Sequence, residues 1–563
     1  MGGGQQEVAV SLLRAAAQVG DWVCLKNLHL VVSWLPSLEK ELSSLETHQD
    51  FRLWLTTEPH NEFPPLLLQQ SLKVTFEAPP GLKKNLQRTY STWPASVVEE
   101  GDEMKAQLLL ALAWFHGIVQ ERKVFKPQGW TKEYEFSVGD LRAGSMVMAE
   151  TCKSGRVDWK TVRGLMEDAV YGGRVDNPFD MRVLTAYLQA MFNSDVVGSV
   201  VGGADRGGQL SRFLTVPGTN RYSDYIHAVQ QLPDMDHPSV FGLPDNIERS
   251  VQRAGSSSVI AGLRRLSAGT VGKGKFDRET WRAQLGPLLE AWDKLSSSMG
   301  ASSGREPGGT STGKRKSSRT GGRDLQPVDA FVVMEDALAT ELVTLVGASL
   351  AGVKRVVYGT ALLTPAIQAT GASLMASEVP PDWSRHWEGP ETPQAWLSAL
   401  ARRKVSLSRW VGASVKGTLL DEPVDLSDLF NPSTFLNAVR QQTTRQSNCS
   451  MDALKLVSCW ESGRLKSAML PVSVEGLRLQ GAAFSGGTLH QQSPNDPEVA
   501  GVPDLTLAYV PKVQPNPYQA GQAIDIPLYF SLDRERLLVE VSMPTKEPRD
   551  TWILAGVALF LKE

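Results

Sequence analysis

The sequence predicts a multidomain chain: an incomplete α/β module, then an α-helical lid, then a last domain of helices followed by a small antiparallel β-barrel. Three observations lead to this fold class. Short apolar runs flank a helical pattern at the start, 3.6-residue periodicity dominates the middle, and two-residue periodicity begins near Leu465. With 563 residues, 42% of them hydrophobic, the chain has room for about three or four domains with their own cores.

Residues 1–90 have the strand–helix–strand order of the later half of a P-loop nucleotide-binding fold. Residues 22–27 (WVCLKN) form a short apolar run that is typical of a buried parallel strand. Residues 30–45 place large apolar side chains on one helical face, and residues 51–59 predict a second strand. Residues 72–81 predict a third strand, which two prolines and a glycine would end.

The strand ends of this module carry polar residues where a P-loop enzyme holds its catalytic groups. In an ATPase of this type, acidic residues after the first strand hold magnesium and polarise water. Here that strand ends in Lys26 and Asn27, which cannot do this work. Thr56 and Thr57 stand where a sensor residue would contact a γ-phosphate. We expect a degenerate edge in which the threonines cap the strand, and no catalytic, cofactor-binding or metal-binding residue in this chain.

A phosphate loop is also not expected. The consensus GxxxxGK[ST] needs a hydroxyl residue after the lysine, because that hydroxyl binds magnesium. The nearest match, residues 308–314, is followed by Arg315 and has no strand before it. It lies within residues 296–326, a run of Ser, Gly, Thr and basic residues that is predicted to be a disordered insertion. The basic residues could contact an acidic partner, but a solvated linker is the simpler interpretation.

Other candidate groups favour structural interpretations. The sequence has no GxSxG or HExxH motif, so neither a serine nucleophile nor a zinc site is predicted. His29 follows the first strand without an evident carboxylate partner, and we expect it to be a structural histidine packed near Trp34. Glu133, Glu135 and Asp140 could form an acid pair, but a solvated face is the simpler interpretation.

Composition narrows the classes of partner. A net charge of −3 argues against binding to nucleic acid or to an anionic membrane. The most apolar predicted helix, residues 108–119, is too short to cross a bilayer. The four cysteines have no CxxC spacing and suit a reducing compartment, where we expect them to be buried small hydrophobes; they are Cys24, Cys152, Cys449 and Cys459.

Periodicity divides the rest of the chain into a helical lid at 91–237, a helical region at 238–464 and a β-barrel at 465–563. Helices are predicted at 104–122, 138–151, 159–170 with Asp158 as cap, 181–192 with Asp180 as cap, 331–350, 393–411 and 432–444. Strands are predicted at 469–479, 482–489, 505–510, 524–530, 536–542 and 552–561, with a tight hairpin turn at 485–487.

Several of these segments resemble dynein heavy chains. Similarity to the sixth AAA+ module of that family lies in GDWVCLKNLHLVVSWLPSLEKEL, FRLWLTTEP and SLKVTFEAPPGLKKNLQRTY. The match continues in the same order through PQGWTKEYEFSVGDLRAG, YGGRVDNPFDMRVL and FGLPDNIERS. The dynein C-terminal domain is similar to WEGPETPQAWL, DLSDLFNPSTFLNAVRQQTTR and the closing GVALFLKE. The sequence of residues 24–34, CLKNLHLVVSW, most resembles the ciliary class of dynein heavy chains, which serves retrograde intraflagellar transport.

The resemblance implies ATP-driven, minus-end-directed movement on microtubules, in the cytoplasm, cytoskeleton and cilium. ATP and magnesium would bind AAA+ modules that precede Met1, and microtubules would be contacted only through upstream regions. The implied partners are the rest of the AAA+ ring and dynein intermediate, light intermediate and light chains. This chain would close and brace the ring without hydrolysing ATP itself. The alternative is a freestanding, non-catalytic scaffold or regulatory protein built from the same domains, and an independent metabolic enzyme is least favoured.

Overall fold

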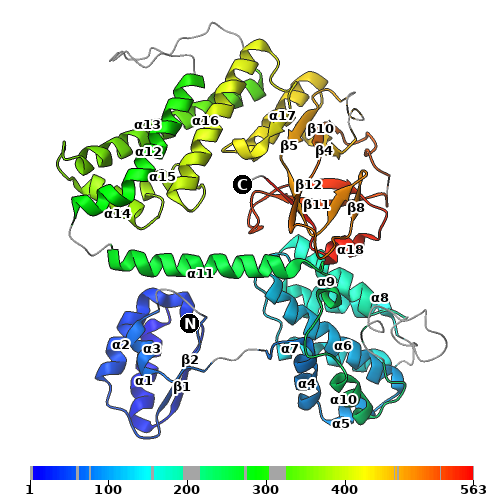
Figure 1. The fold of residues 1–563 in the computed structure, drawn as a ribbon. Helices are drawn as coiled ribbons and strands as arrows, with labels where there is room; N and C mark the ends of the chain where they lie inside the picture. Colours follow the sequence, from blue (N-terminus) through cyan, green and yellow to red (C-terminus); the bar gives the residue numbers. More distant parts are fainter. Residues whose placement is uncertain are drawn as a thin grey trace. The chain divides into compact units, whose positions relative to one another are not determined.

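The computed structural model in Figure 1 contains two compact units, Met1–Ala78 and Pro79–Glu563. The structure describes residues 4–58, 63–74, 78–153, 157–194, 213, 216–271, 276–302, 325–461, 463, 465, 468–519 and 521–561. Each unit has hydrophobic clusters of its own and is described by itself.

The first unit is a parallel strand pair with helices. Strand β1 (Trp22–Leu25) pairs with β2 (Arg52–Leu55), in a register that runs from Trp22↔Arg52 to Leu25↔Leu55. The connection between them is the 3-10 helix η1 (Leu28–Trp34) followed by α2 (Leu35–Ser44). Helix α1 (Gln6–Val19) precedes the strands, and α3 (Pro65–Gln70) follows them.

Two expectations for this unit need correction. The helix predicted from residue 30 begins as a 3-10 segment, which is interrupted by non-helical geometry at Val31. The third strand predicted at 72–81 is wrong for 72–74 and 78–81, which are not strand, while 75–77 lie outside the described residues. Pro79 and Pro80 cannot donate ladder hydrogen bonds, which agrees with the absence of strand at 78–81.

The two faces of this strand pair differ. Val23 and Leu25 are buried in a core with Leu13 of α1 and Leu35 of α2. We call the opposite face, formed by Trp22, Cys24, Arg52 and Trp54, the tryptophan face; all four of these residues are exposed. The two tryptophan rings lie 6.1 Å apart. Alternation along each strand places these side chains opposite the buried ones.

All four cysteines are free thiols. Cys459 is buried, as expected, but Cys24 is exposed, and Cys152 and Cys449 are partly exposed. The expectation of four buried cysteines is therefore wrong for Cys24, because β1 buries only its other face.

The second unit begins with a helical lid. Its elements are α4 (Leu82–Thr92), α5 (Ala95–Glu99), α6 (Glu103–Glu121), η2 (Arg122–Phe125), α7 (Val138–Cys152), α8 (Trp159–Leu165), the π-helical η3 (Met166–Val170), η4 (Gly172–Arg174), α9 (Pro178–Met191), α10 (Tyr222–Gln230) and η6 (Pro238–Phe241). Helix α6 is central, since every residue from Ala106 to Val119 is buried. Leu82, Leu86 and Tyr90 of α4 pack in the same core, so residues 79–90 pack with the lid, whereas the sequence grouped them with the α/β module.

The caps of two lid helices were predicted from sequence. Asp158 caps α8 as expected, and its carboxylate accepts hydrogen bonds from the backbone N–H groups of Lys160 and Thr161. For α9 the prediction was wrong: Asn177, not Asp180, is the cap, and its side chain accepts from the N–H of Phe179. Pro178 stands at the first helical position, where a missing N–H costs nothing.

Long helices form the next part of this unit: α11 (Ile247–Val271), α12 (Arg278–Ser302), α13 (Pro327–Val357), α14 (Pro365–Met375), α15 (Pro381–Ser384), α16 (Pro393–Lys416) and α17 (Pro432–Ser447). The predicted insertion at 296–326 needs correction at its start, because α12 continues to Ser302. Met299 is buried there, and the Ser297 hydroxyl donates to the carbonyl of Asp293 in the preceding turn. Residues 303–324, and with them the nearest phosphate-loop match at 308–314, lie outside the described residues.

Two mixed sheets and a hairpin complete the fold. One sheet has the order β3 (Val424–Asp425), β5 (Val472–Glu475), β10 (Leu505–Pro511), β4 (Leu454–Cys459). The other has the order β12 (Leu537–Pro544), β11 (Ala523–Tyr529), β13 (Ala558–Phe560), β6 (Arg478–Gln480), β9 (Val499–Gly501). Strands β7 (Ala483–Ser485) and β8 (Thr488–His490) form the hairpin, and α18 (Arg549–Leu554) precedes β13.

These sheets differ from the antiparallel β-barrel that the sequence predicted. Among the described residues no sheet closes on itself, and the pairs β11–β13 and β3–β5 are parallel. The strand predicted at 552–561 begins in α18 and becomes strand only at Ala558. The predicted hairpin turn is confirmed: Ser485 pairs with Thr488, and Gly486 and Gly487 both have the positive φ that a two-residue turn needs.

Candidate functional site

The strand-end edge of the first unit brings two of the four predicted site residues together. Leu25 and Leu55 are partners in the ladder, so the residues that follow them are neighbours. The backbone N–H of Asn27 donates to the Thr56 hydroxyl at 3.0 Å, and the N–H of Thr56 donates to the carbonyl of Leu25 at 3.0 Å. Asn27 has φ 58°, a left-handed conformation that asparagine tolerates well. Thr56 therefore joins the two strand ends.

The other predicted threonine is directed elsewhere. The Thr57 hydroxyl donates to the carbonyl of Glu58 at 2.9 Å. Glu58 also approaches His29: its N–H donates to His29 Nδ1 at 3.2 Å, and its carboxylate lies 3.9 Å from His29 Nε2. Sequence reasoning missed this partner, although His29 and Glu58 each follow one of two parallel strands. The Glu58 side chain is 76% exposed, so the pair is a surface contact.

The groups at this edge do not fit hydrolysis of magnesium–ATP. Such a site needs carboxylate oxygens for the metal and available backbone amides for the phosphates. The Asn27 amide is already bound to the Thr56 hydroxyl, and the residue before it is Lys26. Within the described ranges, no group of three or more His, Cys, Asp or Glu side chains could hold a metal ion. That Lys26, Asn27, Thr56 and Thr57 form a degenerate edge remains a proposal.

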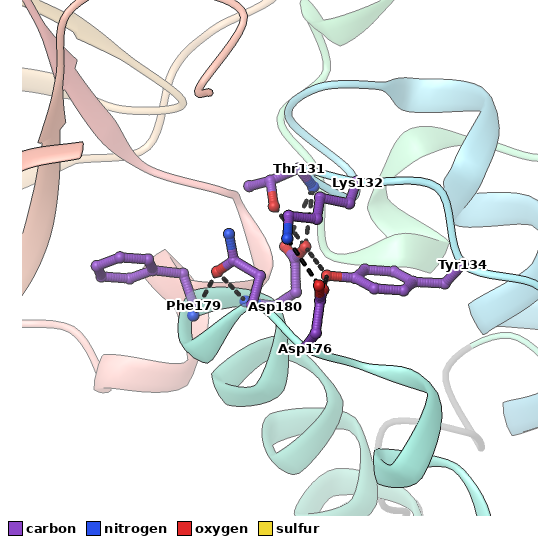
Figure 2. Close-up of polar contacts among 7 residues, drawn as sticks. Thr131, Lys132, Tyr134, Asp176, Phe179 and Asp180 are labelled. Carbon is purple, nitrogen blue, oxygen red and sulfur yellow. Dashed lines mark hydrogen bonds and ion pairs between the residues drawn. The ribbon is translucent and has the colours of Figure 1, made fainter. Parts of the chain in front are cut away.

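A polar cluster in the lid surrounds the start of α9 (Figure 2). Asp180 accepts hydrogen bonds from the Thr131 N–H at 3.1 Å, the Thr131 hydroxyl at 2.5 Å and the Tyr134 hydroxyl at 2.8 Å. Asp176 accepts from Lys132 Nζ at 2.7 Å and from Tyr134 at 3.2 Å. Burial and the charge of Asp180 raise the pKa of Tyr134, while the hydrogen bond from Lys132 lowers the pKa of Asp176. The cluster anchors the 131–134 loop to α9.

Glu133, Glu135 and Asp140, for which a solvated face was expected and an acid pair was the alternative, do not form a pair. Glu133 forms an exposed ion pair with Lys126 at 3.1 Å, and Glu135 is exposed. Asp140 is buried in a capping box with Ser137, and Arg174 donates to its carboxylate at 3.0 Å. The solvated-face interpretation is therefore wrong for Asp140, which stabilises the start of α7.

A parallel strand pair, a lid built around α6, and long helices followed by open sheets are the parts of a P-loop module with its lid and an appended domain. Comparison with known protein families shows which family has these three domains. Residues 1–75 match the region D6 P-loop domain of dynein heavy chains, residues 105–247 their AAA lid domain, and residues 256–561 their C-terminal domain. The protein belongs to the dynein heavy chain family.

Its relatives include cytoplasmic dynein 2 heavy chain 1. The chain is 44% identical to that protein of Tripneustes gratilla over 567 residues and 42% identical to that of Homo sapiens over 564 residues. Both alignments cover 100% of this chain and 13% of the relative, so the chain spans about an eighth of the length of these relatives. Identity to the cytoplasmic dynein heavy chain of Dictyostelium discoideum is 27% over 582 residues, which cover 98% of this chain and 12% of that protein. In the described part of the chain, no helix has the length and apolarity that crossing a membrane requires.

Proposed function

We propose that this chain is the ring-closing, C-terminal region of a minus-end-directed microtubule motor that serves retrograde intraflagellar transport in the cilium. The observation that carries this proposal is the difference in identity between two classes of relative. Cytoplasmic dynein 2 heavy chains of sea urchin, green alga and mammals are 42–44% identical to the chain, whereas two cytoplasmic dynein heavy chains are 27–28% identical. ATP and magnesium would act in other modules of the complete heavy chain.

Within that motor, the proposed role of this chain is to brace the ring without hydrolysing ATP. Two structural features support the role. The strand-end edge uses the Asn27 amide and the Thr56 hydroxyl to hold its own backbone. The lid and the C-terminal sheets lie in one compact unit and share hydrogen bonds. The proposed partners are the rest of the AAA+ ring and the dynein intermediate, light intermediate and light chains.

A chimera tests the transport class. In the Chlamydomonas reinhardtii cytoplasmic dynein 2 heavy chain, this chain replaces the matching segment, to which it is 44% identical. The chimera is expressed in cells that lack the native heavy chain. We expect retrograde transport, followed by imaging of particles in the flagellum, to be restored. A control chimera carries the matching segment of the Dictyostelium discoideum heavy chain. Equal restoration by the control, or failure of a stable, correctly assembled chimera, would contradict the proposal. Restoration by this chain only as a separate polypeptide would support the scaffold alternative.

A further inference from the structure

Residues 554–556 are the last residue of α18 and the two that follow it, and we call this segment the 554–556 turn; all three of its carbonyl groups are bound by side chains. Leu554 accepts from Arg122 Nη2 at 2.7 Å, and Ala555 accepts from Gln128 Nε2 at 2.8 Å. Gly556 accepts from Arg534 Nη2 at 2.7 Å. Arg122 and Gln128 belong to the lid, whereas Arg534 follows β11 in the C-terminal sheets. The turn is therefore bound from both parts of the second unit.

Arg122 is fully buried and gathers four segments around one guanidinium group. Besides Leu554, it donates to the carbonyls of Gly129 and Phe241 and to the hydroxyl of Tyr187, each at 2.7 Å. These four acceptors are neutral oxygens. A planar guanidinium group offers five N–H donors in a fixed arrangement, which a lysine ammonium group cannot reproduce. The geometry of Arg122 is thus specific to arginine.

Arg534, from the C-terminal sheets, binds the same turn through Gly556. Its Nη2 also donates to the side-chain carbonyl of Gln480 in β6 at 2.8 Å. The Gln480 amide group donates in turn to Glu498 at 3.0 Å and to Ser250 of α11 at 3.4 Å. Arg534 is 6% exposed, and burial lowers its pKa to about 10. The second guanidinium therefore connects the turn to the five-stranded sheet.

Glycines allow this close approach. A Cβ added at Gly242 would lie 2.8 Å from the Cβ of Leu554, and one at Gly481 would lie 2.9 Å from the Ala555 carbonyl oxygen. A Cβ at Gly556 would lie 2.4 Å from the Gln128 carbonyl oxygen. Real Cβ atoms do not approach other atoms below 3.0 Å. Glycine at all three positions leaves the room that the turn needs between the lid and the sheets.

The exposed contacts between the lid and the sheets are of a different kind. Arg182 of α9 pairs with Glu540 of β12 at 2.9 Å, and both side chains are about 40% exposed. Water screens such a pair, so it contributes little to holding the two parts together. The buried turn is the stronger connection, because breaking a buried hydrogen bond to a charged group leaves that group without its acceptor.

We propose that Arg122 and Arg534 form a double clamp on the 554–556 turn, and that this clamp couples the lid mechanically to the C-terminal sheets. The clamp deepens the bracing role proposed above, since displacement of the lid would be carried to β13 through the carbonyl groups of the turn. Packed side chains and hydrogen-bond networks carry coupling between parts of a protein, so loss of such a connection should separate the behaviour of the two parts. The double clamp is such a connection.

The experiment compares Arg122→Lys with Arg182→Lys in the full chain. Both variants keep the positive charge, but only Arg122 is part of the clamp. We expect Arg122→Lys to raise amide hydrogen exchange in β13 at least tenfold and to separate the thermal unfolding of the lid from that of the sheets. Arg182→Lys should leave both readouts unchanged. Unchanged exchange in β13 for a folded Arg122→Lys, or equal effects of the two variants, would overturn the proposal.

A second pair of variants covers the case in which Arg122→Lys does not fold. Gly556→Ala introduces a Cβ against Gln128 and leaves Arg122 in the lid core. The matched control is Gly417→Ala, which also lies at positive φ after a helix but has no atom within 4 Å of the added Cβ. Separation of the two unfolding transitions only in Gly556→Ala supports the clamp, whereas a single lowered transition in both variants contradicts it. Neither result depends on motor activity, so failure of the chimera leaves this test intact.

Discussion

At the scale of single residues, burial shifts the pKa of a side chain away from the value usual for its type. His116 lies in the middle of α6 and is 4% exposed. Its Nδ1 lies 3.0 Å from the hydroxyl of Tyr171. Burial lowers the pKa of His116 from 6.5 to about 4; the charge of Arg88 adds to this, and that of Asp140 opposes it. The folded lid therefore holds a neutral histidine near pH 7.

This lowered pKa predicts a pH-dependent stability. Between pH 6.5 and about 4 the unfolded chain binds a proton at His116 that the folded chain does not bind. The free energy of unfolding should thus fall as the pH is lowered through this window, by about 3 kcal/mol for this group. His116→Gln removes the titration and should flatten the decline. Urea denaturation of the full chain and the variant at pH 7, 6 and 5 measures the difference, and parallel declines would refute the assignment.

The sequence indicates which residue types can cap the start of a helix, but it does not always show which position is the cap. Asn177 and Asp180 are both good cap residues, and local pattern alone does not choose between them. Pro178 at the first helical position favours Asn177, a signal that was present in the sequence. The actual role of Asp180 depends on Thr131, which lies 49 positions away in the chain, and so could not be found from local pattern.

At the scale of elements, long amphipathic helices were predictable and short strands were not. Helices α16 and α17 each bury one apolar face, as their periodicity predicts, and α6, predicted from its apolar run, is buried on all sides. Strand β3 has two residues, too few to show a period, and β13 pairs with β6, about 80 positions earlier in the chain. Whether sheets close depends on such distant pairings, which explains why the barrel was expected and open sheets are found.

The tryptophan face is an element-scale feature with a measurable consequence. Parallel sheets are normally covered on both faces, yet Trp22 and Trp54 are 68% and 51% exposed in this unit. We expect the full chain to self-associate through this face as its concentration rises, because contiguous exposed apolar surface promotes association. The double change Trp22→Lys and Trp54→Lys should keep the chain monomeric in sedimentation velocity.

The matched control for this prediction is Leu362→Lys. Leu362 is 88% exposed, belongs to the second unit and is not one of the residues of the tryptophan face. The control should associate as the unchanged protein does. If the unchanged protein stays monomeric at every concentration, or if both variants suppress association equally, the tryptophan face is not the surface responsible.

At the scale of the whole molecule, the sequence showed the family, and the structure showed how its parts are built. Matches to a P-loop domain, a lid and a C-terminal domain of dynein heavy chains together span most of the chain. The strand-end residues Lys26, Asn27, Thr56 and Thr57 were identifiable because parallel strands end at a common edge. The clamp at 554–556 was not, because Arg122 and Leu554 lie 432 positions apart.

The central claim is that this protein braces a motor without hydrolysing ATP, and phosphate release tests it most directly. The purified full chain is incubated with millimolar magnesium–ATP, alongside the variants Asn27→Ala, Thr56→Val and, as a control at an exposed helical threonine, Thr344→Val. The account predicts that none of these proteins releases phosphate above the protein-free background, because Lys26 and Asn27 follow the first strand where an ATPase has the acidic residues that hold magnesium. Magnesium-dependent turnover that Asn27→Ala and Thr56→Val abolish, and that Thr344→Val leaves intact, would contradict it.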